Sequence, residues 1–359
     1  MRKIYINGRF LTQKTTGVQR VAEEIVKEID NLLEDKELSK EFNFIILTPK
    51  NVIKNIKLKR IQVQQVGLLK GHLWEQLELP IYSRGDILIN FCNTGPLFKR
   101  EQVVFIHDAA IYSKPDGFSK KFVAWYKMVY KLVSKFSRGI ITVSNFSKEE
   151  LISNLPDVAS KIRVIKIGVD HIEKVEKDEE ILKKFNLEKD NFMLAVGSLH
   201  PNKNFKAILS ALDHMQNFAG QVVIAGGIDK KVVSEETSGF GGNITYVGYV
   251  TDEELCGLYS NAKVFIFPSI YEGFGLPPIE AMRLGCPVIA SNVASIPEVC
   301  KDGAVYFNPI EPSELVEKIK LFYNNQIDKN ELTTKALKIA KGYTWKKTAV
   351  ELIDTLREK

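Results

Sequence analysis

The sequence predicts an α/β chain that is built from two domains, each with a parallel sheet. Short apolar runs alternate with amphipathic helical patterns along nearly the whole chain, which indicates repeated β-α-β units. The runs are apolar at almost every position, as expected for parallel strands that are covered on both faces. The length of 359 residues also exceeds what one hydrophobic core usually supports, so two domains are expected.

The expected strands form two sets along the chain. The first set comprises residues 3–7, 44–48, 86–90, 103–107, 139–144 and 162–168, and the second comprises 192–197, 221–226, 243–248, 263–268 and 287–291. Helices with a period of 3.6 residues are expected between them, for example over 18–33, 205–215 and 252–260. The charged stretch 171–180 separates the two sets, and we interpret it as the interdomain linker that leads into a short helix. The predicted domains are residues 1–170 and 171–342, and a last helix within 343–359 could cross back onto the first domain.

Composition and charge exclude several classes of protein. The net charge of +6 comes from 50 basic and 44 acidic residues, which is a mild bias towards anionic partners. Because the basic residues are interspersed with acids and form no known module, no nucleic-acid partner is expected. The four cysteines show no paired spacing and the N-terminus has no signal-peptide pattern, so a reduced, cytoplasmic protein is expected. No window approaches the ~18 apolar residues of a membrane-spanning helix.

The most informative motif is a glycine turn flanked by two carboxylates. An expected strand ends before Glu272, a loop with Gly275 follows, and a helix opens at two prolines with Glu280 expected in its first turn. The backbone N–H groups near Gly275 and Leu276 would then form an anion site at a helix N-terminus. Two carboxylates beside such a site are better suited to sugar and ribose hydroxyls than to phosphate. For either acid alone, a helix-capping or solvated role is the simpler interpretation.

A second pattern places a lysine where it could neutralise a diphosphate, although a lysine at this place alone is more simply interpreted as a surface residue of a helix. The expected strand 192–197 is followed by the letters SLHPNKNF, so that Lys203 opens the next helix. A fixed lysine together with helix N–H groups can stabilise the charge that develops on a departing diphosphate without a metal. The sequence has no D-x-D motif, and its five histidines show no ligand spacing. We therefore expect neither a metal nor a cofactor.

The first domain offers two candidate site residues. Gly17 lies in a loop between the first strand and a helix, which is weak evidence by itself for a phosphate loop. His107 ends the expected strand 103–107, where it could orient a sugar or assist proton transfer. An ordinary βα turn and a structural histidine are the alternatives.

Glu272 and Glu280 are eight residues apart in the segment YEGFGLPPIEAMRLGCPVIAS. This segment resembles the E-x7-E signature of the retaining family 4 glycosyltransferases. The resemblance extends through TTGVQR, FIHD, ITVSNFSKEEL, KIGVD, AVGSLHPNKN and VGYVTDEEL. It implies the GT-B fold, in which two Rossmann-like domains face a central cleft. The N-terminal domain would bind the acceptor and the C-terminal domain the nucleotide sugar. Bacterial polysaccharide-type mannosyl-, rhamnosyl- and glucosyltransferases are the similar members.

The resemblance also implies roles for individual residues. Glu280 would hold the ribose, and Glu272 and His107 would act on the transferred sugar as the catalytic residues. The residues expected to line the donor sugar and diphosphate are Gly17, Ser198, Lys203, Gly273, Phe274, Gly275 and Leu276. Ser198 and Asn202 stand where many relatives have arginine, so Lys203 has fewer cations beside it than is usual in the family. The Ser198 hydroxyl or Arg20 could make the missing contact with the second phosphate.

The expected activity is transfer of a hexose, with retention of configuration, from a nucleoside-diphosphate sugar to a saccharide or lipid-linked saccharide in surface polysaccharide synthesis. A sugar-nucleotide epimerase of the same fold and a non-catalytic partner subunit are the alternatives. A lipid-linked acceptor would require peripheral contact at the inner face of the membrane. The helix expected over 118–136 offers Trp125, Tyr126 and four spaced lysines for such contact, although the same pattern fits a core-facing helix with solvated lysines.

Overall fold

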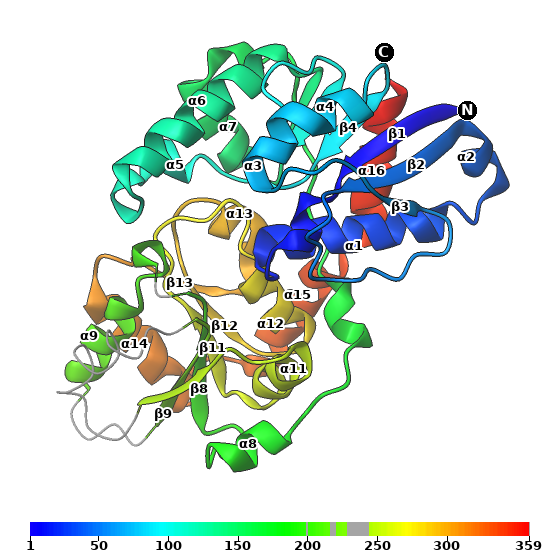
Figure 1. Ribbon diagram of the computed structural model, residues 1–359. Coiled ribbons are helices and arrows are strands. Elements are labelled where there is room, and N and C mark those ends of the chain that lie inside the picture. Colours follow the sequence, from blue (N-terminus) through cyan, green and yellow to red (C-terminus); the bar gives the residue numbers. More distant parts are fainter. Residues whose placement is uncertain (199, 216–219, 228–243, 359) are drawn as a thin grey trace. The chain divides into compact units, whose positions relative to one another are not determined.

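The computed structural model describes residues 1–198, 200–215, 220–227 and 244–358 of the chain (Figure 1). The chain divides into two compact units, of which unit 1 contains Met1–Gly168 and Thr344–Lys359, and unit 2 contains Val169–Tyr343. The boundaries expected from the sequence were residues 170 and 342.

Unit 1 is built on a seven-stranded parallel sheet with the order β3-β2-β1-β4-β5-β6-β7. Its strands are β1 (Arg2–Asn7), β2 (Phe42–Thr48), β3 (Gln62–Gln65), β4 (Ile87–Asn90), β5 (Gln102–Phe105), β6 (Gly139–Thr142) and β7 (Ile162–Val164). Its α-helices are α1 (Gly17–Leu32), α2 (Lys36–Glu41), α3 (Gly71–Leu73), α4 (Leu79–Tyr82), α5 (Ala110–Ser113), α6 (Lys120–Phe136), α7 (Asn145–Asn154) and α16 (Trp345–Arg357). Shorter helical segments are η1 (Gly8–Thr12), η2 (Trp74–Glu78, a π-helical turn), η3 (Pro115–Gly117) and η4 (Pro156–Val158).

The described part of unit 2 contains a six-stranded parallel sheet with the order β10-β9-β8-β11-β12-β13. Its strands are β8 (Phe192–Val196), β9 (Gln221–Ala225), β10 (Ile244–Gly248), β11 (Val264–Phe267), β12 (Val288–Ser291) and β13 (Val305–Phe307). Its helical segments are η5 (Asp170–Lys174), α8 (Glu180–Lys184), η6 (Pro201–Lys203), α9 (Phe205–Asp213), α11 (Asp252–Asn261), α12 (Leu276–Arg283), α13 (Ile296–Cys300), η7 (Lys301–Gly303), α14 (Pro312–Tyr323) and α15 (Lys329–Lys341).

Both sheets have one position at which the chain reverses its direction of progress across the sheet. In unit 1 this position lies between β1 and β4, and in unit 2 it lies between β8 and β11. Open α/β sheets bind ligands at such switch points, beyond the carboxyl ends of the two strands. The loops that follow β1, β4, β8 and β11 are therefore the first places to look for a site.

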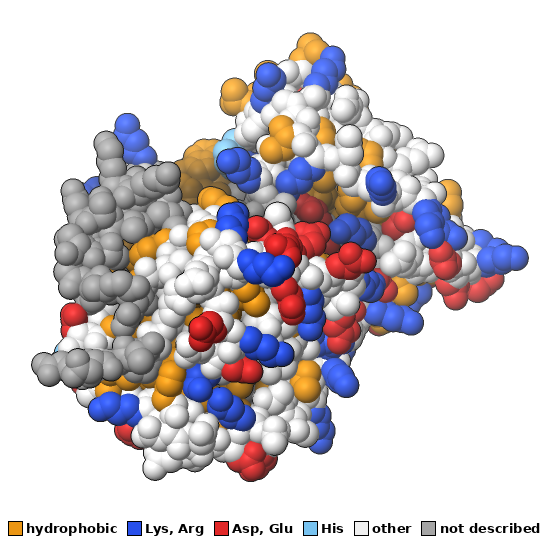
Figure 2. Space-filling model, turned by 90° about the horizontal axis from the view of Figure 1, so that it is seen from below, with side chains coloured by type: hydrophobic (Ala, Val, Ile, Leu, Met, Phe, Trp, Pro, Cys, Tyr) orange, Lys and Arg blue, Asp and Glu red, His pale blue; other side chains and the backbone are white. Residues whose placement is uncertain are grey.

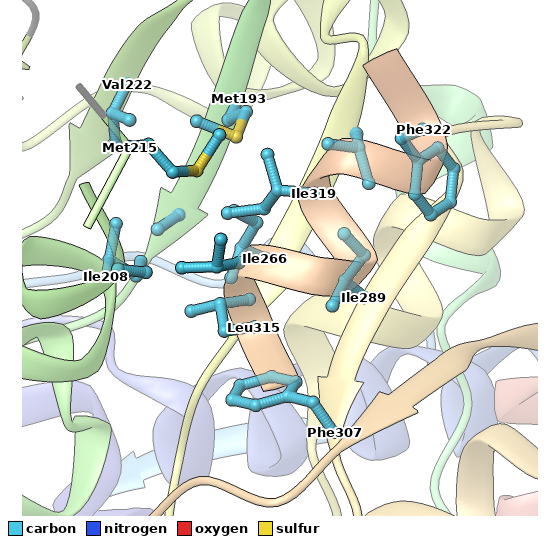
Figure 3. Packing of buried hydrophobic residues seen from close by; sticks show 14 of the residues in the cluster. Met193, Ile208, Met215, Val222, Ile266, Ile289, Phe307, Leu315, Ile319 and Phe322 are labelled. Atoms are coloured by element: carbon cyan, nitrogen blue, oxygen red, sulfur yellow. The ribbon is translucent and has the colours of Figure 1, made fainter. Parts of the chain in front are cut away.

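The core of unit 2 explains why its strands are apolar at successive positions. Strand side chains such as Met193, Ile266 and Ile289 are 0% exposed and pack beneath Ile208 of α9 and Ile319 of α14 (Figure 3). A sheet covered by helices needs apolar residues on its inner faces, which is the pattern that the sequence shows. The α/β fold class predicted from that pattern is confirmed.

The structure differs from the sequence prediction in three elements. The stretch predicted as a linker begins instead with η5, in which His171 is 8% and Ile172 1% exposed, so this part belongs to the interior of unit 2. Strand β3 was not expected, because its four residues are polar or exposed and lie at the sheet edge. Strand β13 was also missed, because it is only three residues long.

Helix α16 packs against α1 in unit 1, and both can be followed in Figure 1 as the red and blue helices. The Thr348 hydroxyl donates to the Lys166 carbonyl at 2.8 Å. A Cβ at Gly168 would lie 2.2 Å from the backbone nitrogen of Trp345, so only glycine permits this approach. Across the described ranges, no helix is long and apolar enough to cross a membrane.

Candidate active site

The switch point of unit 2 brings together two of the residues that the sequence singled out. Lys203 lies in the loop after β8, and Glu272 lies in the loop after β11. The Lys203 Nζ is 2.6 Å from the Glu272 Oε1, and the two side chains are 24% and 13% exposed. The predicted phosphate cation and the predicted sugar carboxylate are thus an ion pair at the carboxyl edge of the sheet. Lys203 itself ends the short η6 turn and precedes α9, whereas the sequence suggested that it opens the helix.

Backbone and side-chain hydrogen bonds hold these two loops against each other. The Ile270 N–H donates to the Asn202 carbonyl at 2.8 Å, and the Asn204 amide donates to the carbonyl of Pro268 at 3.2 Å. Asn204 takes a left-handed conformation with φ of 50°, which directs the chain into α9. On the other side, the buried Ser295 hydroxyl donates to the Glu272 carbonyl at 2.9 Å. Asn204 and Ser295 therefore fix the positions of Lys203 and Glu272, and no motif in the sequence pointed to them.

A glycine pair makes room for the lysine. A Cβ at Gly226, where φ is +138°, would lie 1.9 Å from the Gly197 carbonyl oxygen, so the ends of β8 and β9 approach each other at glycine. A Cβ at Gly197 would be 3.4 Å from the Lys203 side-chain carbons, which shows that this stem packs over the glycine. Ser198, the next residue, is exposed.

The glycine turn after β11 leads into α12 as the sequence suggested. Gly275 has φ of +93° and is the N-cap, and Leu276 is the first helical residue. Because residues 277 and 278 are prolines without N–H groups, Gly275 and Leu276 supply the backbone donors of this helix start. Gly273 adjoins them. The Phe274 ring is 4% exposed and packs edge-on against Tyr343 at 5.5 Å, so only its backbone can line a donor site.

Glu280 lies on the second turn of α12, one turn later than we expected. Its side chain is 11% exposed between two polar groups of unit 2. The His171 Nε2 is 3.5 Å from one carboxylate oxygen, and the Tyr259 hydroxyl donates to the other at 3.4 Å. Burial and the Glu280 charge raise the pKa of Tyr259 well above its usual value, so this phenol stays protonated and can donate. Neither His171 nor Tyr259 was identified from the sequence, because their proximity to Glu280 depends on the tertiary fold.

His107 follows β5 in unit 1 and is 6% exposed. Its Nε2 is 2.8 Å from the Phe91 carbonyl oxygen, and its backbone N–H donates to Asn93 at 2.9 Å. Burial lowers the pKa of His107 to about 4 despite the Phe91 hydrogen bond, so the ring is neutral near pH 7. A neutral ring that donates through Nε2 has Nδ1 as a hydrogen-bond acceptor. This favours orientation of a sugar hydroxyl over donation of a proton.

Gly17 is the first residue of α1 and is exposed. Thr16 and Gln19 form a capping box around it, in which the Thr16 N–H donates to the Gln19 side chain at 3.3 Å. The loop is thus an ordered helix start, which is compatible with a phosphate contact but does not require one.

The switch point of unit 1 holds a buried ion pair that the sequence analysis missed. Arg9 follows β1, and its Nε is 3.1 Å from the carboxylate of Glu75, which is 1% exposed. Asn7 and Thr94 also donate to this carboxylate, at 2.9 and 3.0 Å. Burial alone would raise the pKa of Glu75, but Arg9, His72 and Asn7 together hold it below its usual value. The pair therefore remains charged at neutral pH.

The surface charges, the possible metal ligands and the cysteines complete the description of the charged and reactive groups. Lys and Arg side chains lie among Asp and Glu side chains over the face shown in Figure 2. Within the described parts of the chain, no group of three or more His, Cys, Asp or Glu residues could hold a metal ion. The cysteines are free, and burial raises the pKa of Cys92 to about 12, so this thiol is not a ready nucleophile.

Comparison with known proteins identifies the family of the chain. A family model described as glycosyl transferases group 1 matches residues 176–339. The chain is 30% identical to the O-antigen chain mannosyltransferase B of Escherichia coli over 265 residues, which cover 71% of this chain and 70% of the relative. It is 29% identical to the O-antigen chain mannosyltransferase RfbU of Salmonella typhimurium, over 78% and 77% of the two chains.

Solved structures support the same fold. A complex of Anabaena Alr3699/HepE with UDP and glucose superposes with a TM-score of 0.75 at 16% identity, and the match covers 100% of each chain. The lipopolysaccharide glycosyltransferase WaaG superposes with a TM-score of 0.73 at 15% identity, again over 100% of both chains. At this identity the likeness establishes the GT-B fold. The sequence relatives establish the family. The chain belongs to the group 1 glycosyltransferases, which its E-x7-E segment resembles.

Proposed function

We propose that this glycosyltransferase moves a hexose from a nucleoside-diphosphate sugar to a saccharide or lipid-linked saccharide acceptor, with retention of the anomeric configuration and without a metal. The observation that carries the proposal is the Lys203–Glu272 ion pair of 2.6 Å at the switch point of unit 2. A nucleotide sugar presents a phosphate on one side of the bond that breaks and the sugar with its hydroxyls on the other. A cation at this position suits the phosphate, and a carboxylate suits the hydroxyls.

In the proposed donor complex, Lys203 turns to the diphosphate together with the backbone N–H groups of Gly275 and Leu276. The Ser198 hydroxyl adds a neutral donor. Glu272 then accepts hydrogen bonds from hydroxyls of the sugar, beside the backbone of Gly273 and Phe274. The hydrogen bonds from Ser295 and Asn204 limit the movement of both loops, so the charges are already oriented before the donor binds.

Glu280 accepts hydrogen bonds from the ribose hydroxyls. Its contacts with Tyr259 and His171 support this role, because they fix the carboxylate and leave its remaining lone pairs for a ligand. His107 orients the sugar through the acceptor Nδ1, in keeping with its neutral ring. Gly17 contributes a backbone contact at the start of α1.

The proposed reaction exchanges one glycosidic bond for another on the same face of the sugar. The bond between the anomeric carbon and the diphosphate oxygen breaks, and a bond from that carbon to the acceptor oxygen forms. The acceptor proton passes to the departing diphosphate, whose charge Lys203 stabilises. Because the acceptor attacks on the face that the diphosphate leaves, no covalent glycosyl-enzyme is required.

Mannose is the sugar that the relatives favour. The two relatives described above are named O-antigen chain mannosyltransferases, so we assign this protein to the synthesis of a bacterial surface polysaccharide. The acceptor is then a growing saccharide, either attached to a lipid carrier or without one.

A donor panel and product analysis test the proposal. The protein is incubated with nucleoside-diphosphate mannose, glucose and rhamnose, with and without a saccharide acceptor, and the anomeric configuration of the product is read by NMR. We expect transfer only with acceptor, with the donor configuration retained. Glu280→Gln should weaken binding of the nucleoside by about 1.5–3 kcal/mol, because a charged hydrogen bond is lost. Glu317→Gln, an exposed glutamate on α14, is the matched control.

Three results would contradict the proposal. Inversion of configuration would overturn the same-face reaction. A new sugar nucleotide formed from the donor alone would indicate an epimerase. Absence of transfer and of nucleotide binding in the folded parent would indicate a non-catalytic subunit.

A further inference from the structure

A row of apolar side chains lies exposed on the helical segment 71–82 of unit 1. Leu73, Leu77 and Ile81 recur every four residues, and they are 63%, 57% and 69% exposed. Trp74 and Leu79, on the opposite face of the same segment, are 0% exposed. The spacing places the three exposed residues on one side of the helix. We call Leu73, Leu77 and Ile81 the apolar stripe.

The apolar stripe is part of a larger apolar surface. Phe98, which is 72% exposed, lines one pocket with Pro80 of the segment, and Leu68, which is 78% exposed, is held at the segment by its N–H donation to Glu78. A pocket of about 380 Å³ opens between the segment and the loop before β5, and its lining includes Pro80, Arg84, Leu97, Phe98, Lys99 and Arg100. Monomeric proteins seldom expose a contiguous apolar surface of this kind unless it binds a partner or a membrane.

Helix α6 lies beside this surface and is strongly basic. The His72 ring is 5.9 Å from the Trp125 ring, and the Phe98 ring is 5.7 Å from the Phe136 ring, so the second turn and the last residue of α6 contact the region. Residues 120–136 contain five lysines and no acid. Trp125 and Tyr126, which the sequence suggested as membrane contacts, pack against the core of unit 1. On α6 the exposed large apolar residues are Phe122 and Met128, at 38% and 41%, which is less than the exposure of the apolar stripe. Helix α6 therefore supplies mainly charge.

The charged side chains around the apolar stripe are mostly cationic. Lys70, Arg84 and Arg100 are exposed. The carboxylate of the nearby Glu78 accepts hydrogen bonds from the backbone. The Leu68 N–H donates to Oε1 and the Leu69 N–H donates to Oε2, each at 2.9 Å. At the edge of the region, Glu101 pairs with Arg138 at 3.5 Å. Asp86 and Glu101 both act on Lys99, so the excess of positive charge in the region comes mainly from the five lysines of α6.

We propose that this surface docks onto a bilayer that contains anionic phospholipids. The apolar stripe enters the boundary between headgroups and acyl chains, and Arg84, Arg100 and the lysines of α6 contact lipid phosphates. A second copy of the chain is a poorer occupant, because a two-fold contact would bring the same positive charges against each other. The proposal concerns unit 1 alone and does not depend on the identity of the sugar.

Vesicle flotation tests the proposal with the full chain. The parent is mixed at low salt with vesicles of phosphatidylcholine alone or of phosphatidylcholine with one quarter phosphatidylglycerol. We expect binding only to the anionic vesicles, and less binding at high salt. The triple variant Leu73→Ser/Leu77→Ser/Ile81→Ser should lower the partition coefficient roughly a hundredfold, because three apolar side chains no longer leave water.

Two further variants separate the contributions. Arg84→Ala/Arg100→Ala should remove the preference for anionic lipid while a weak general affinity remains. Ile310→Ser, which replaces a 75% exposed apolar residue of unit 2, is the matched control and should bind like the parent. Retained helical circular dichroism shows that each variant is folded.

The proposal is overturned if the parent ignores anionic vesicles, or if the triple variant binds them as the parent does. A dimer in light scattering that the triple variant abolishes, together with no vesicle binding, would assign the surface to a second copy instead.

Discussion

Replacing Lys203 with methionine should weaken binding of a nucleoside diphosphate without weakening binding of the corresponding nucleoside. Methionine keeps most of the apolar stem that packs over Gly197 and removes the charge. A charged hydrogen bond to phosphate contributes about 1.5–3 kcal/mol, so the dissociation constant for the diphosphate should rise about 10–150-fold. The nucleoside has no phosphate for Lys203 to contact, so its affinity should stay within about twofold of the parent.

The Glu272 partner makes the experiment sharper. The Lys203 Nζ has the Glu272 carboxylate at 2.6 Å, and a diphosphate must compete with it. Glu272→Gln should therefore bind the free diphosphate as tightly as the parent or up to about tenfold more tightly, since the side chains are partly exposed and the competing pair is screened. The same variant should lose turnover, because the sugar loses a charged acceptor. Opposite effects of the two variants on one ligand are difficult to obtain from general misfolding.

Isothermal titration calorimetry with the nucleoside and the nucleoside diphosphate measures both affinities. Lys320→Met, an exposed lysine on α14, is the control and should match the parent. The double variant Lys203→Met/Glu272→Gln should be more stable to urea than the Lys203→Met variant, because it no longer leaves a partly buried carboxylate without its partner. The reasoning fails if Lys203→Met binds the diphosphate as the parent does, or if nucleoside affinity falls by the same factor.

The other predictions concern His107, metal dependence and the α16 crossing. The His107→Gln variant can still donate to the Phe91 carbonyl but cannot titrate. The parent ring binds a proton below about pH 6.5 in the unfolded state but only near pH 4 in the folded state. The free energy of unfolding of the parent should therefore fall by about 3 kcal/mol as the pH drops through this window, and the variant should lack this fall. Urea unfolding that depends on pH alike in parent and variant would show that the ring is not buried. Transfer activity should survive EDTA, and loss with rescue by Mg²⁺ or Mn²⁺ would show that Lys203 does not suffice for the diphosphate. Gly168→Ala should cost about 1–3 kcal/mol of unfolding free energy, because its Cβ would meet backbone at 2.2 Å, whereas Gly139→Ala, whose Cβ would have ordinary contacts at 3.8 Å, should cost less than half of that.

The strands and the fold class could be predicted because their signal is local. Each buried strand is a short apolar run, and the alternation with helices needs no knowledge of contacts between distant residues. Strand β3, with the letters QVQQ, carries no such signal, since it is an exposed edge strand that is held by its pairing with β2. The segment 171–180 misled for a related reason. Its charges suggested a solvated linker, while His171 and Ile172 are buried by the packing of η5 against α12.

The candidate site could be predicted as a set of residue types but not as a set of contacts. Lys203 and Glu272 were found separately, each beside its own strand end, and their pairing joins residues that are 69 positions apart. The groups around Glu280 were missed because Tyr259 lies on α11 and His171 on a supposed linker, and neither has a distinctive sequence neighbourhood. Such partners become visible only when the strand order is known.

The two switch points offer a final comparison, because each holds one cation–glutamate pair. In unit 1 the Arg9–Glu75 pair is 9% and 1% exposed, and Asn7 and Thr94 also donate to the carboxylate. In unit 2 the Lys203–Glu272 pair is 24% and 13% exposed. A closed network with additional donors has little capacity to exchange partners, whereas a partly open pair can admit a ligand.

Matched substitutions in the two pairs should therefore have opposite consequences. Glu75→Gln should cost about 3–5 kcal/mol of unfolding free energy, because it leaves the Arg9 cation buried without its counterion. Glu272→Gln should cost about 1 kcal/mol or less, since solvent screens the remaining lysine, and its main effect should be on turnover. Urea unfolding and steady-state kinetics on the two variants measure both quantities. If Glu75→Gln is as stable as the parent, or if Glu272→Gln is the variant that unfolds, burial does not separate the structural pair from the functional one.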